Sequence, residues 1–238
     1  DTGSHNARFA DAEARTAGRT GEGTGAWADP DGLPDIYIAM GQTAENVAEH
    51  KGVSRQAQDE WGVRSQNRAE AAQASGFFER EIAPYTLPDG TVVSADDGIR
   101  PGTTYEKVSQ LSPVFRPDGT VTAANACPLN DGAAAVVVMS DTRAAELGIK
   151  PLARIISSGV SALSPEIMGL GPIEAIRQAL GRAGMTPDDI DLFEINEAFA
   201  AQVLPSADEV GIDLDKLNVN GGAIALGHPF GMTGARIM

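Results

Sequence analysis

Residues 218–235 read NVNGGAIALGHPFGMTGA, and residues 194–200 just before them read EINEAFA. Five glycines of the first stretch surround its single histidine, His228, and glycine is used where a backbone turns sharply or approaches a ligand closely. Pro229 restricts His228 to an extended backbone, so we expect the imidazole to stand on a loop and not on a helix. An incidental histidine in a glycine-rich connection is the alternative, but the pattern favours a loop built to hold His228.

Composition limits the class of protein. The chain has 238 residues, of which 42% are hydrophobic and 21% charged, which is typical of a soluble globular protein with one large domain or two small ones. It contains no apolar run close to the roughly 20 residues of a membrane span and no signal peptide, so we expect no membrane insertion and a cytoplasmic location.

Charge and metal-binding residue types exclude further functions. The formal net charge of −15 argues against broad nucleic-acid binding, because nucleic acids are polyanions. Cys127 is the single cysteine, which rules out an internal disulfide and a cysteine-based zinc cluster. The three histidines are scattered along the chain, so no metal site is indicated.

The first half of the chain reads as helices followed by a long loop region. Residues 1–30 show no sustained period and are expected to be irregular. A short helix is predicted over 40–49 and a longer one from an N-cap at Ser54 to about Ser75, closed by Gly76, with Trp61 in a core or an interface. Five prolines make 84–119 loop-rich, and long ordered loops usually cover a site.

The second half alternates strand and helix patterns, which predicts an α/β layered fold. Strands are predicted over 133–139, 153–160, 190–195 and 217–219. Helices are predicted from a cap at Asp141 to Gly148, from Pro172 to Gly184, and over 197–210.

Asn196 and Glu197 lie where a strand meets a helix, and His228 lies just beyond the next strand. In α/β sheets, ligand-binding groups gather beyond the carboxyl ends of strands, so these places can face one site. An amide and an imidazole there suit polarisation of a carbonyl or activation of a nucleophile. Capping of the helix by Asn196 and Glu197 is an equally open interpretation of the same pattern.

Two further patterns are weaker. Gly169-Leu-Gly171 precedes a helix but lacks the third glycine of a dinucleotide-binding loop, so a helix-entry turn explains it better. Cys127 could pair with His228, but it lies in a turn without a basic neighbour that would lower the pKa of its thiol. We therefore do not expect Cys127 to be a nucleophile.

The chain resembles the thiolases, the acetyl-CoA acyltransferases that cleave or form 3-oxoacyl-CoA. The resemblance rests on motifs in the family's order from about residue 36 to the end. They are residues 40–46 (MGQTAEN), 99–104 (IRPGTT), 111–115 (LSPVF), 120–136 (TVTAANACPLNDGAAAV), 168–172 (MGLGP), 196–201 (NEAFAA) and 221–229 (GGAIALGHP), with Gly231 and 233–236 after them.

This resemblance implies a layered α/β/α/β/α fold of two similar halves, incomplete here, with an inserted loop domain that covers coenzyme A. Residues 31–128 would form most of the loop domain. Residues 129–150 would return into the first half, and 151–238 would begin the second. Thiolase relatives are usually dimers or tetramers, so the resemblance also implies a homodimer or homotetramer.

The resemblance also implies a reaction and its site. A cysteine thiolate attacks a 3-oxoacyl-CoA, acetyl-CoA leaves, and CoA takes the acyl group as co-substrate, with no permanently bound cofactor. His228 matches the histidine that activates the nucleophile and helps to polarise the thioester oxygen. Asn196 matches the residue that holds the water of that oxyanion site. The positions implied to line the acyl and CoA pocket are Met40, Arg100, Phe115, Cys127, Met168, Phe199 and Gly227.

The chain departs from the family in one respect. A thiolase needs a nucleophilic cysteine before the loop domain and an acid/base cysteine near its C terminus, and both regions are absent. We therefore expect a thiolase fragment, inactive alone, from an acetyl-CoA C-acyltransferase of lipid metabolism such as β-oxidation. The alternative is a non-catalytic CoA-binding or interaction module on the same scaffold. An unrelated α/β hydrolase is disfavoured, because no Gly-x-Ser-x-Gly motif is present.

Overall fold

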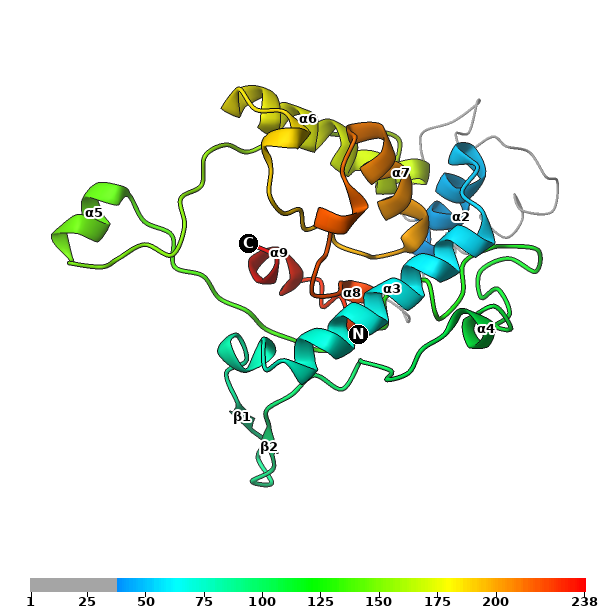
Figure 1. Ribbon diagram of the computed structural model, residues 1–238, viewed down its shortest axis with the longest axis horizontal. Helices are drawn as coiled ribbons and strands as arrows, with labels where there is room; N and C mark the ends of the chain where they lie inside the picture. The colour runs from blue at the N-terminus through cyan, green and yellow to red at the C-terminus, as the bar shows by residue number, and fades with distance from the viewer. Residues whose placement is uncertain (1–37) are drawn as a thin grey trace.

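The computed structural model describes residues 38–238 (Figure 1), so the expectation for residues 1–30 lies outside the described part. The α-helices are α2 (Met40–Lys51), α3 (Arg55–Ala74), α4 (Tyr105–Val108), α5 (Asp141–Glu146), α6 (Gly171–Ala183), α7 (Ala200–Val210), α8 (Ala223–Leu226) and α9 (Thr233–Arg236). The 3-10 turns are η1 (Phe78–Arg80), η2 (Pro165–Leu170), η3 (Pro187–Asp189) and η4 (Leu214–Lys216), and the strands are β1 (Tyr85–Thr86) and β2 (Val92–Val93).

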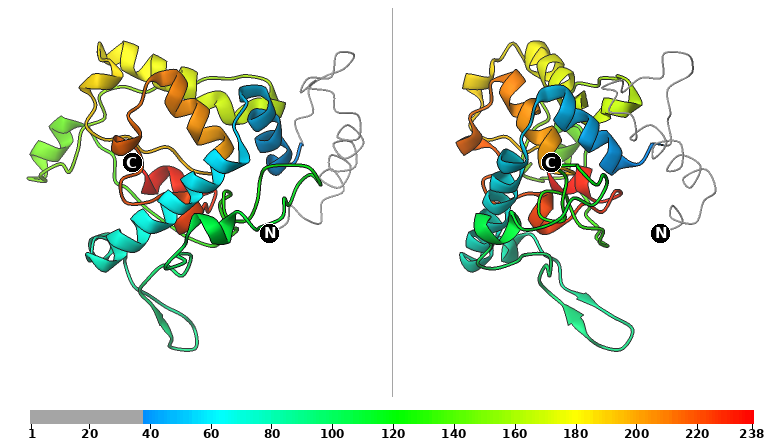
Figure 2. Two further views of the ribbon diagram at one scale, coloured as in Figure 1. Left: turned by 45° about the vertical axis from the view of Figure 1, so that its right-hand side comes forward. Right: turned by 90° about the vertical axis from the view of Figure 1, so that its right-hand side faces the viewer.

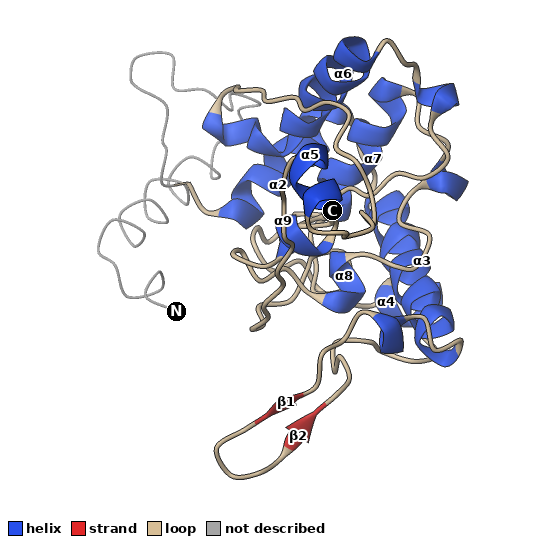
Figure 3. Cartoon of the chain, turned by 90° about the vertical axis from the view of Figure 1, so that its left-hand side faces the viewer, coloured by secondary structure: helices blue, strands red, loops and turns tan. Residues whose placement is uncertain are grey.

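The helices α2 and α3 confirm the prediction for the first half. The Ser54 hydroxyl accepts a hydrogen bond of 3.1 Å from the backbone N–H of Ala57, so it caps α3 as expected. A left-handed glycine follows each helix, Gly52 after α2 and Gly76 after α3. The loop-rich region also forms as predicted, apart from short α4 and the β1–β2 hairpin, which projects from the helices (Figures 1 and 3).

The strands predicted over 133–139 and 153–160 are wrong as ladder strands. Both segments run extended without pairing, and the Val137 side chain is 85% exposed. They lead to and from α5, which lies at the end of a long excursion from the other helices (Figures 1 and 2). A strand exists only beside another strand, and within residues 38–238 none lies alongside these two. The strands predicted over 190–195 and 217–219 meet only at a parallel bridge between Phe193 and Leu217.

Two predicted helix starts also need correction. The cap of α5 is Ser140, whose hydroxyl accepts from the N–H of Arg143, and Asp141 is the first helical residue. Helix α7 begins at Ala200 and not at Glu197, because residues 196–199 stay extended and Phe199 occupies the N-cap position.

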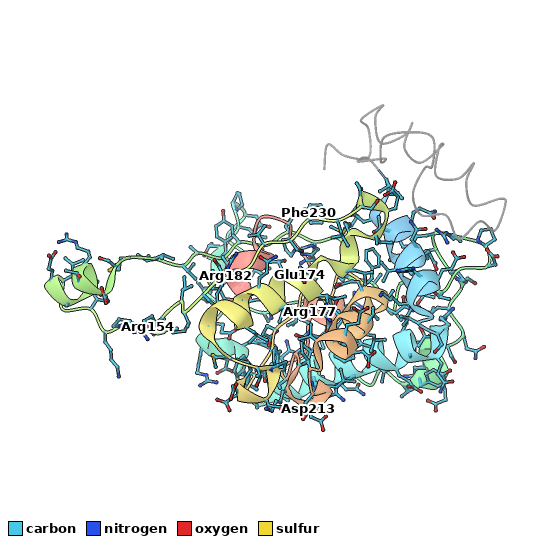
Figure 4. All side chains as sticks on the ribbon, turned by 90° about the horizontal axis from the view of Figure 1, so that it is seen from above. Arg154, Glu174, Arg177, Arg182, Asp213 and Phe230 are labelled. Atoms are coloured by element: carbon cyan, nitrogen blue, oxygen red, sulfur yellow. The ribbon has the colours of Figure 1, made fainter. Side chains whose placement is uncertain are left out.

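Helix α6 begins and ends as predicted, with Gly184 left-handed at its end. Its charged face carries Glu174, Arg177 and Arg182, which Figure 4 labels along the helix, whereas Arg154 lies far out on the extended excursion. Arg177 donates to the backbone oxygen of Glu209 on α7 at 2.8 Å. This hydrogen bond links α6 to α7.

The main apolar core lies where α3 crosses α7 and α8. Trp61 of α3 packs there with residues of α7, α8 and the bridged segments, chiefly Ile195, Val203, Leu217 and Ile224. Helix α3 therefore provides the surface on which the 194–200 and 218–228 segments are assembled.

Across residues 38–238, no helix is both long enough and apolar enough to cross a membrane.

The side chain of Asn218 joins these two segments. Its amide oxygen accepts from the N–H of Ile195 at 2.9 Å, and its amide nitrogen donates to the Ile195 oxygen at 2.9 Å and to Glu197 Oε1 at 2.8 Å. Arg68 of α3 donates to the backbone oxygens of Leu217 and Asn218. The buried Asn218 side chain thus replaces backbone pairing that a continuous sheet would supply.

We predict that Asn218→Ala lowers the free energy of unfolding by about 2–4 kcal/mol. The change leaves the buried N–H and C=O of Ile195 unpaired, and it places alanine at a φ of 48°, which asparagine tolerates better. Urea unfolding measures the loss. Asn220→Ala is the matched control, because within the described residues the Asn220 side chain makes no hydrogen bond, and we expect a change below about 0.5 kcal/mol. Equal effects of the two substitutions would contradict the assigned role.

Candidate active site

The loop that presents His228 depends on the backbone of Gly227. Gly227 has φ 88° and ψ 167°, and a Cβ there would lie 2.2 Å from Oδ1 of Asn130. The same Asn130 oxygen accepts a hydrogen bond of 3.1 Å from the N–H of His228. Glycine is therefore required for Asn130 to hold the His228 backbone. His228 lies between α8 and α9, in a loop as predicted.

The Thr233 hydroxyl holds the Nδ1 side of the His228 ring. Nδ1 of His228 lies 2.7 Å from the Thr233 hydroxyl, and that hydroxyl donates to the Pro229 backbone oxygen at 3.1 Å. When the hydroxyl hydrogen points to Pro229, Nδ1 carries the proton and donates it to Thr233. Nε2 makes no hydrogen bond within the described residues, and in this tautomer its lone pair is available to act as a general base.

Burial keeps this ring uncharged. The part-buried His228 side chain has a pKa below the ordinary value of 6.5, because desolvation disfavours the imidazolium form. The Phe230 ring contacts the imidazole edge-on, with ring centroids 5.3 Å apart. A neutral imidazole with a free Nε2 can accept a proton from a thiol near neutral pH.

The alternative in which Asn196 and Glu197 cap a helix is wrong. Helix α7 starts at Ala200, and neither side chain bonds to its first turn. The backbone oxygen of Asn196 accepts from Nε2 of Gln202 at 2.6 Å, which fixes the residue from α7. The side-chain oxygen of Asn196 is buried and has no hydrogen-bond partner within the described residues. This amide is therefore available to a water or a ligand.

Glu197 brings the 194–200 segment against residues 221–228, which we call the glycine stretch. The Glu197 carboxylate accepts from the N–H of Ile224 at 3.2 Å and lies directly on Gly222, where a Cβ would be 2.1 Å from its carboxyl carbon. Asn196 and His228 make no hydrogen bond with each other. The two candidate residues are thus linked by their backbones and not by direct side-chain contact. Glu197 points into the core, so it takes neither of the two roles that the sequence left open for it, a site residue or a helix cap.

Three of the apolar positions lie together. The Phe115 ring covers Gly41, where a Cβ would lie 2.2 Å from the ring, and it meets the Phe199 ring edge-on at 6.1 Å between centroids. Met40, the first residue of α2, is 45% exposed beside them. The fourth, Met168, lies on η2, which packs along α2. These partly exposed apolar side chains lie on and beside the 194–200 segment.

Arg100 lies on a loop that touches α8. Gly98, two residues earlier, approaches so closely that a Cβ there would lie 2.5 Å from the backbone oxygen of Ala225. The exposed Arg100 guanidinium donates to the backbone oxygen of Asp97 at 2.7 Å. The cation therefore stands at the edge of the glycine stretch, where its remaining donors face solvent.

Cys127 lies beside the 194–200 segment, where its N–H donates to the backbone oxygen of Ala198 at 3.0 Å. Burial raises the pKa of its thiol to about 11, and the nearby Glu197 charge adds to the rise. The thiol is therefore protonated near neutral pH, in agreement with the expectation that Cys127 is not a nucleophile. Among the residues from 38 onwards, no group of three His, Cys, Asp or Glu side chains could hold a metal ion.

Sequence reasoning missed the residues of α3 that hold the site from behind. Trp61 and Ser65 both donate to Glu197, and the two lie four positions apart on one face of the helix. Small residues on that face, Gly62, Ser65 and Ala69, were the available signal, because they allow another backbone to approach.

Comparison with known proteins decides the family. A sequence profile described as "Thiolase, N-terminal domain" matches residues 10–142, and one described as "Thiolase, C-terminal domain" matches residues 149–238. The chain belongs to the thiolase family. Among curated relatives it is 54% identical to acetyl-CoA acetyltransferase of Cupriavidus necator over 214 residues, which covers 87% of this chain and 54% of that protein. It is 49% identical to a probable acetyl-CoA acyltransferase of Staphylococcus epidermidis, with the same coverage.

Solved thiolase structures share the fold. The crystal structure of the Bacillus anthracis acetyl-CoA acetyltransferase matches with a TM-score of 0.82 and 46% identity, covering 89% of this chain and 53% of that one. Human mitochondrial 3-ketoacyl-CoA thiolase matches with a TM-score of 0.79 and 42% identity, with the same coverage. The predicted thiolase-like α/β fold, incomplete in this chain, is confirmed. The chain spans about half the length of the relatives it matches.

We predict that nitrogen NMR of the His228 ring at pH 7 finds the proton on Nδ1, with a titration midpoint below 6.5. In Thr233→Val the ring loses its acceptor, so a mixture of tautomers is expected. Thr233→Ser, the matched control, keeps the hydroxyl and should keep the Nδ1 proton. A proton found on Nε2 in the unsubstituted protein would overturn the assignment of the free base.

Proposed function

We propose that a full-length protein containing this chain is a thiolase enzyme, which transfers an acyl group between a 3-oxoacyl-CoA and CoA. The observation that carries the proposal is the His228 ring, whose Nδ1 contacts Thr233, whose Nε2 makes no hydrogen bond within the described residues, and whose pKa is lowered by burial. The names of the relatives, acetyl-CoA acetyltransferase and 3-ketoacyl-CoA thiolase, support the same reaction. CoA is then a co-substrate, and no permanently bound cofactor is needed.

In this proposal His228 moves the proton of a cysteine thiol. Nε2 takes that proton, and the thiolate forms a bond to the 3-oxo carbon of the substrate while the carbonyl oxygen becomes an oxyanion. The Nε2–H so formed can donate to a thioester oxygen, and a water held by the free amide of Asn196 is the second donor. Collapse of the adduct re-forms the carbonyl as an acyl-enzyme thioester and breaks the bond to the acetyl-CoA carbanion, which takes a proton from the family's second, acid/base cysteine.

The acyl group is released to CoA in a second step. The thiolate of the acid/base cysteine takes the proton of the CoA thiol, the CoA thiolate attacks the acyl-enzyme thioester, and the nucleophilic cysteine leaves as a thiolate. Cys127 is the only cysteine of the 238 residues and its thiol stays protonated, so the nucleophile has to come from sequence outside this chain. We therefore propose that the chain alone does not turn over.

The remaining roles follow from where the side chains lie. The partly exposed apolar side chains suit contact with the apolar acyl and pantetheine groups of the substrate; they are Met40, Phe115, Met168 and Phe199. Arg100 offers a guanidinium to a CoA phosphate or adenine. Gly227 and the part-buried Cys127 complete the proposed lining of the pocket.

We also propose the organisation implied by the family. Residues 31–128 form most of a CoA-covering loop domain, 129–150 belong to the first half and 151–238 begin the second. A homodimer or homotetramer in the cytoplasm, acting in lipid metabolism such as β-oxidation, completes the proposal. A similar chain from Saccharomyces cerevisiae is described as a dimeric peroxisomal thiolase, which supports an oligomer.

The test is thiolysis by the purified full-length protein, followed as loss of 3-oxoacyl-CoA in the presence of CoA. We expect turnover of at least one chain length, and a fall in kcat of about 100-fold or more for His228→Ala, because a general base contributes that much. His50→Ala, at the end of α2, is the matched histidine control and should stay within about twofold.

Two results would contradict the proposal. Full activity of His228→Ala would remove the base from the mechanism. Saturable CoA binding in calorimetry without turnover of any 3-oxoacyl-CoA would favour a non-catalytic CoA-binding module on the thiolase scaffold.

A further inference from the structure

The Glu197 carboxylate is fully buried and accepts four hydrogen bonds. Oε1 accepts from the indole N–H of Trp61 at 3.1 Å and from the amide of Asn218 at 2.8 Å. Oε2 accepts from the hydroxyl of Ser65 at 2.6 Å and from the N–H of Ile224 at 3.2 Å. The reaction described above gives this carboxylate no role.

Counting donors and acceptors defines the charge state of this group. Each carboxylate oxygen accepts two hydrogen bonds, so every lone pair is used and no partner remains for an added proton. Ser65 also accepts from the N–H of Gly222 at 3.0 Å, so its one hydrogen goes to Glu197. Burial raises the pKa of Glu197, and the four donors oppose that rise by favouring the ionised form. The positive charge of Arg68 on α3 interacts with it favourably.

The four donors come from segments far apart in sequence. Trp61 and Ser65 belong to α3, Asn218 to the turn before the glycine stretch, and Ile224 to α8 within that stretch. Figure 1 shows α8 lying against α3, in agreement with the packing of these two helices. Asn196 is covalently next to Glu197, and His228 follows Ile224 by four residues. One carboxylate therefore joins the backbones that carry both candidate catalytic residues.

We propose that Glu197 is a positioning residue, whose carboxylate fixes the glycine stretch against α3 and thereby sets His228 relative to Asn196. The catalytic consequence rests on the proposed thiolase function, but the positioning itself does not. Trp61 and Ser65 bind Glu197 to α3. A substitution at either residue should therefore shift His228 although neither contacts it.

The conservative substitution Glu197→Gln should break this arrangement. Its amide group would turn either Trp61 and Asn218 or Ser65 and Ile224 into donors that face donors. The indole N–H, the Ile224 N–H and the Asn218 amide cannot reverse, because the first two are fixed donors and Asn218 is held by both backbone groups of Ile195. The Ser65 hydroxyl can rotate to accept, but the Ile224 N–H beside it cannot, so either orientation leaves at least one donor facing a donor. The glycine stretch must then move away from α3.

Glu45→Gln is the matched control. Glu45 of α2 is likewise buried, at 3% exposure, and accepts from the N–H groups of Thr120 and Val121 and from the Thr120 hydroxyl. It holds a different loop and bonds to neither the 194–200 segment nor the glycine stretch. Both glutamine variants therefore carry the same chemical defect, and only one carries it at the proposed positioning residue.

The experiment compares the full-length protein with Glu197→Gln and Glu45→Gln by three measurements. These are the urea unfolding midpoint, the NMR titration and tautomer of the His228 ring, and kcat and KM for thiolysis. We expect both variants to unfold at lower urea. Only Glu197→Gln should move the His228 midpoint, by about 0.5 pH unit or more, and lower kcat about tenfold or more, with KM within about threefold.

The outcomes separate the alternatives. An unchanged His228 titration and kcat in Glu197→Gln, with only the unfolding midpoint lowered, would overturn the positioning role. Absence of thiolysis in the unsubstituted protein would overturn the proposed function, while the His228 titration would still decide the positioning role. If Glu197→Gln does not fold, Ser65→Ala replaces it: a shifted His228 titration supports the proposal, and an unshifted one overturns it.

Discussion

The second half of the described structure depends on the hydrogen bonds of the Asn218 side chain. It pairs with both backbone groups of Ile195 and reaches Glu197, so it joins the 194–200 segment to the turn before the glycine stretch. In a continuous sheet, backbone ladders would make these connections. Here a left-handed, buried asparagine makes them, next to a single bridge between Phe193 and Leu217.

Helix α3 turns this local pairing into a site. Its buried face contributes Trp61 to the core and Ser65 to the carboxylate, while Arg68 binds the backbone of the Asn218 turn. The glycine stretch can lie directly on this face because Gly221 and Gly222 carry no Cβ, which would collide with Ala69 of α3 and with Glu197. The same glycine-rich backbone leads on to Gly227 and presents the His228 ring with Nε2 free. Packing, polar pairing and candidate chemistry are therefore parts of one arrangement.

Sequence patterns predicted the helices and the family, but not the strands. Ser54 and the glycines that end helices act locally, so α2, α3 and α6 could be placed from their own residues. Strand formation depends on a neighbour, and the apolar run over 133–139 pairs with no described segment, so its pattern alone was misleading.

The candidate site was predictable only in part. His228 and Asn196 were found through the glycine-rich context and the family motifs, and the structure adds the contact between His228 Nδ1 and Thr233. Glu197 was interpreted together with Asn196 as a site residue or a helix cap, because sequence does not tell a carboxylate that faces a ligand from one that faces four donors. Trp61 was expected in the core, but its hydrogen bond to Glu197 depends on residues 136 positions apart.

The most direct measurement is an experimental structure of the full-length protein with a bound CoA thioester. We predict that His228 keeps its bond to Thr233 and that Nε2 lies within about 3.5 Å of a reacting sulfur or oxygen atom, with Asn196 reaching the same oxygen through one water. A structure in which Nε2 bonds to the protein, or in which Asn196 and His228 face separate cavities, would contradict it.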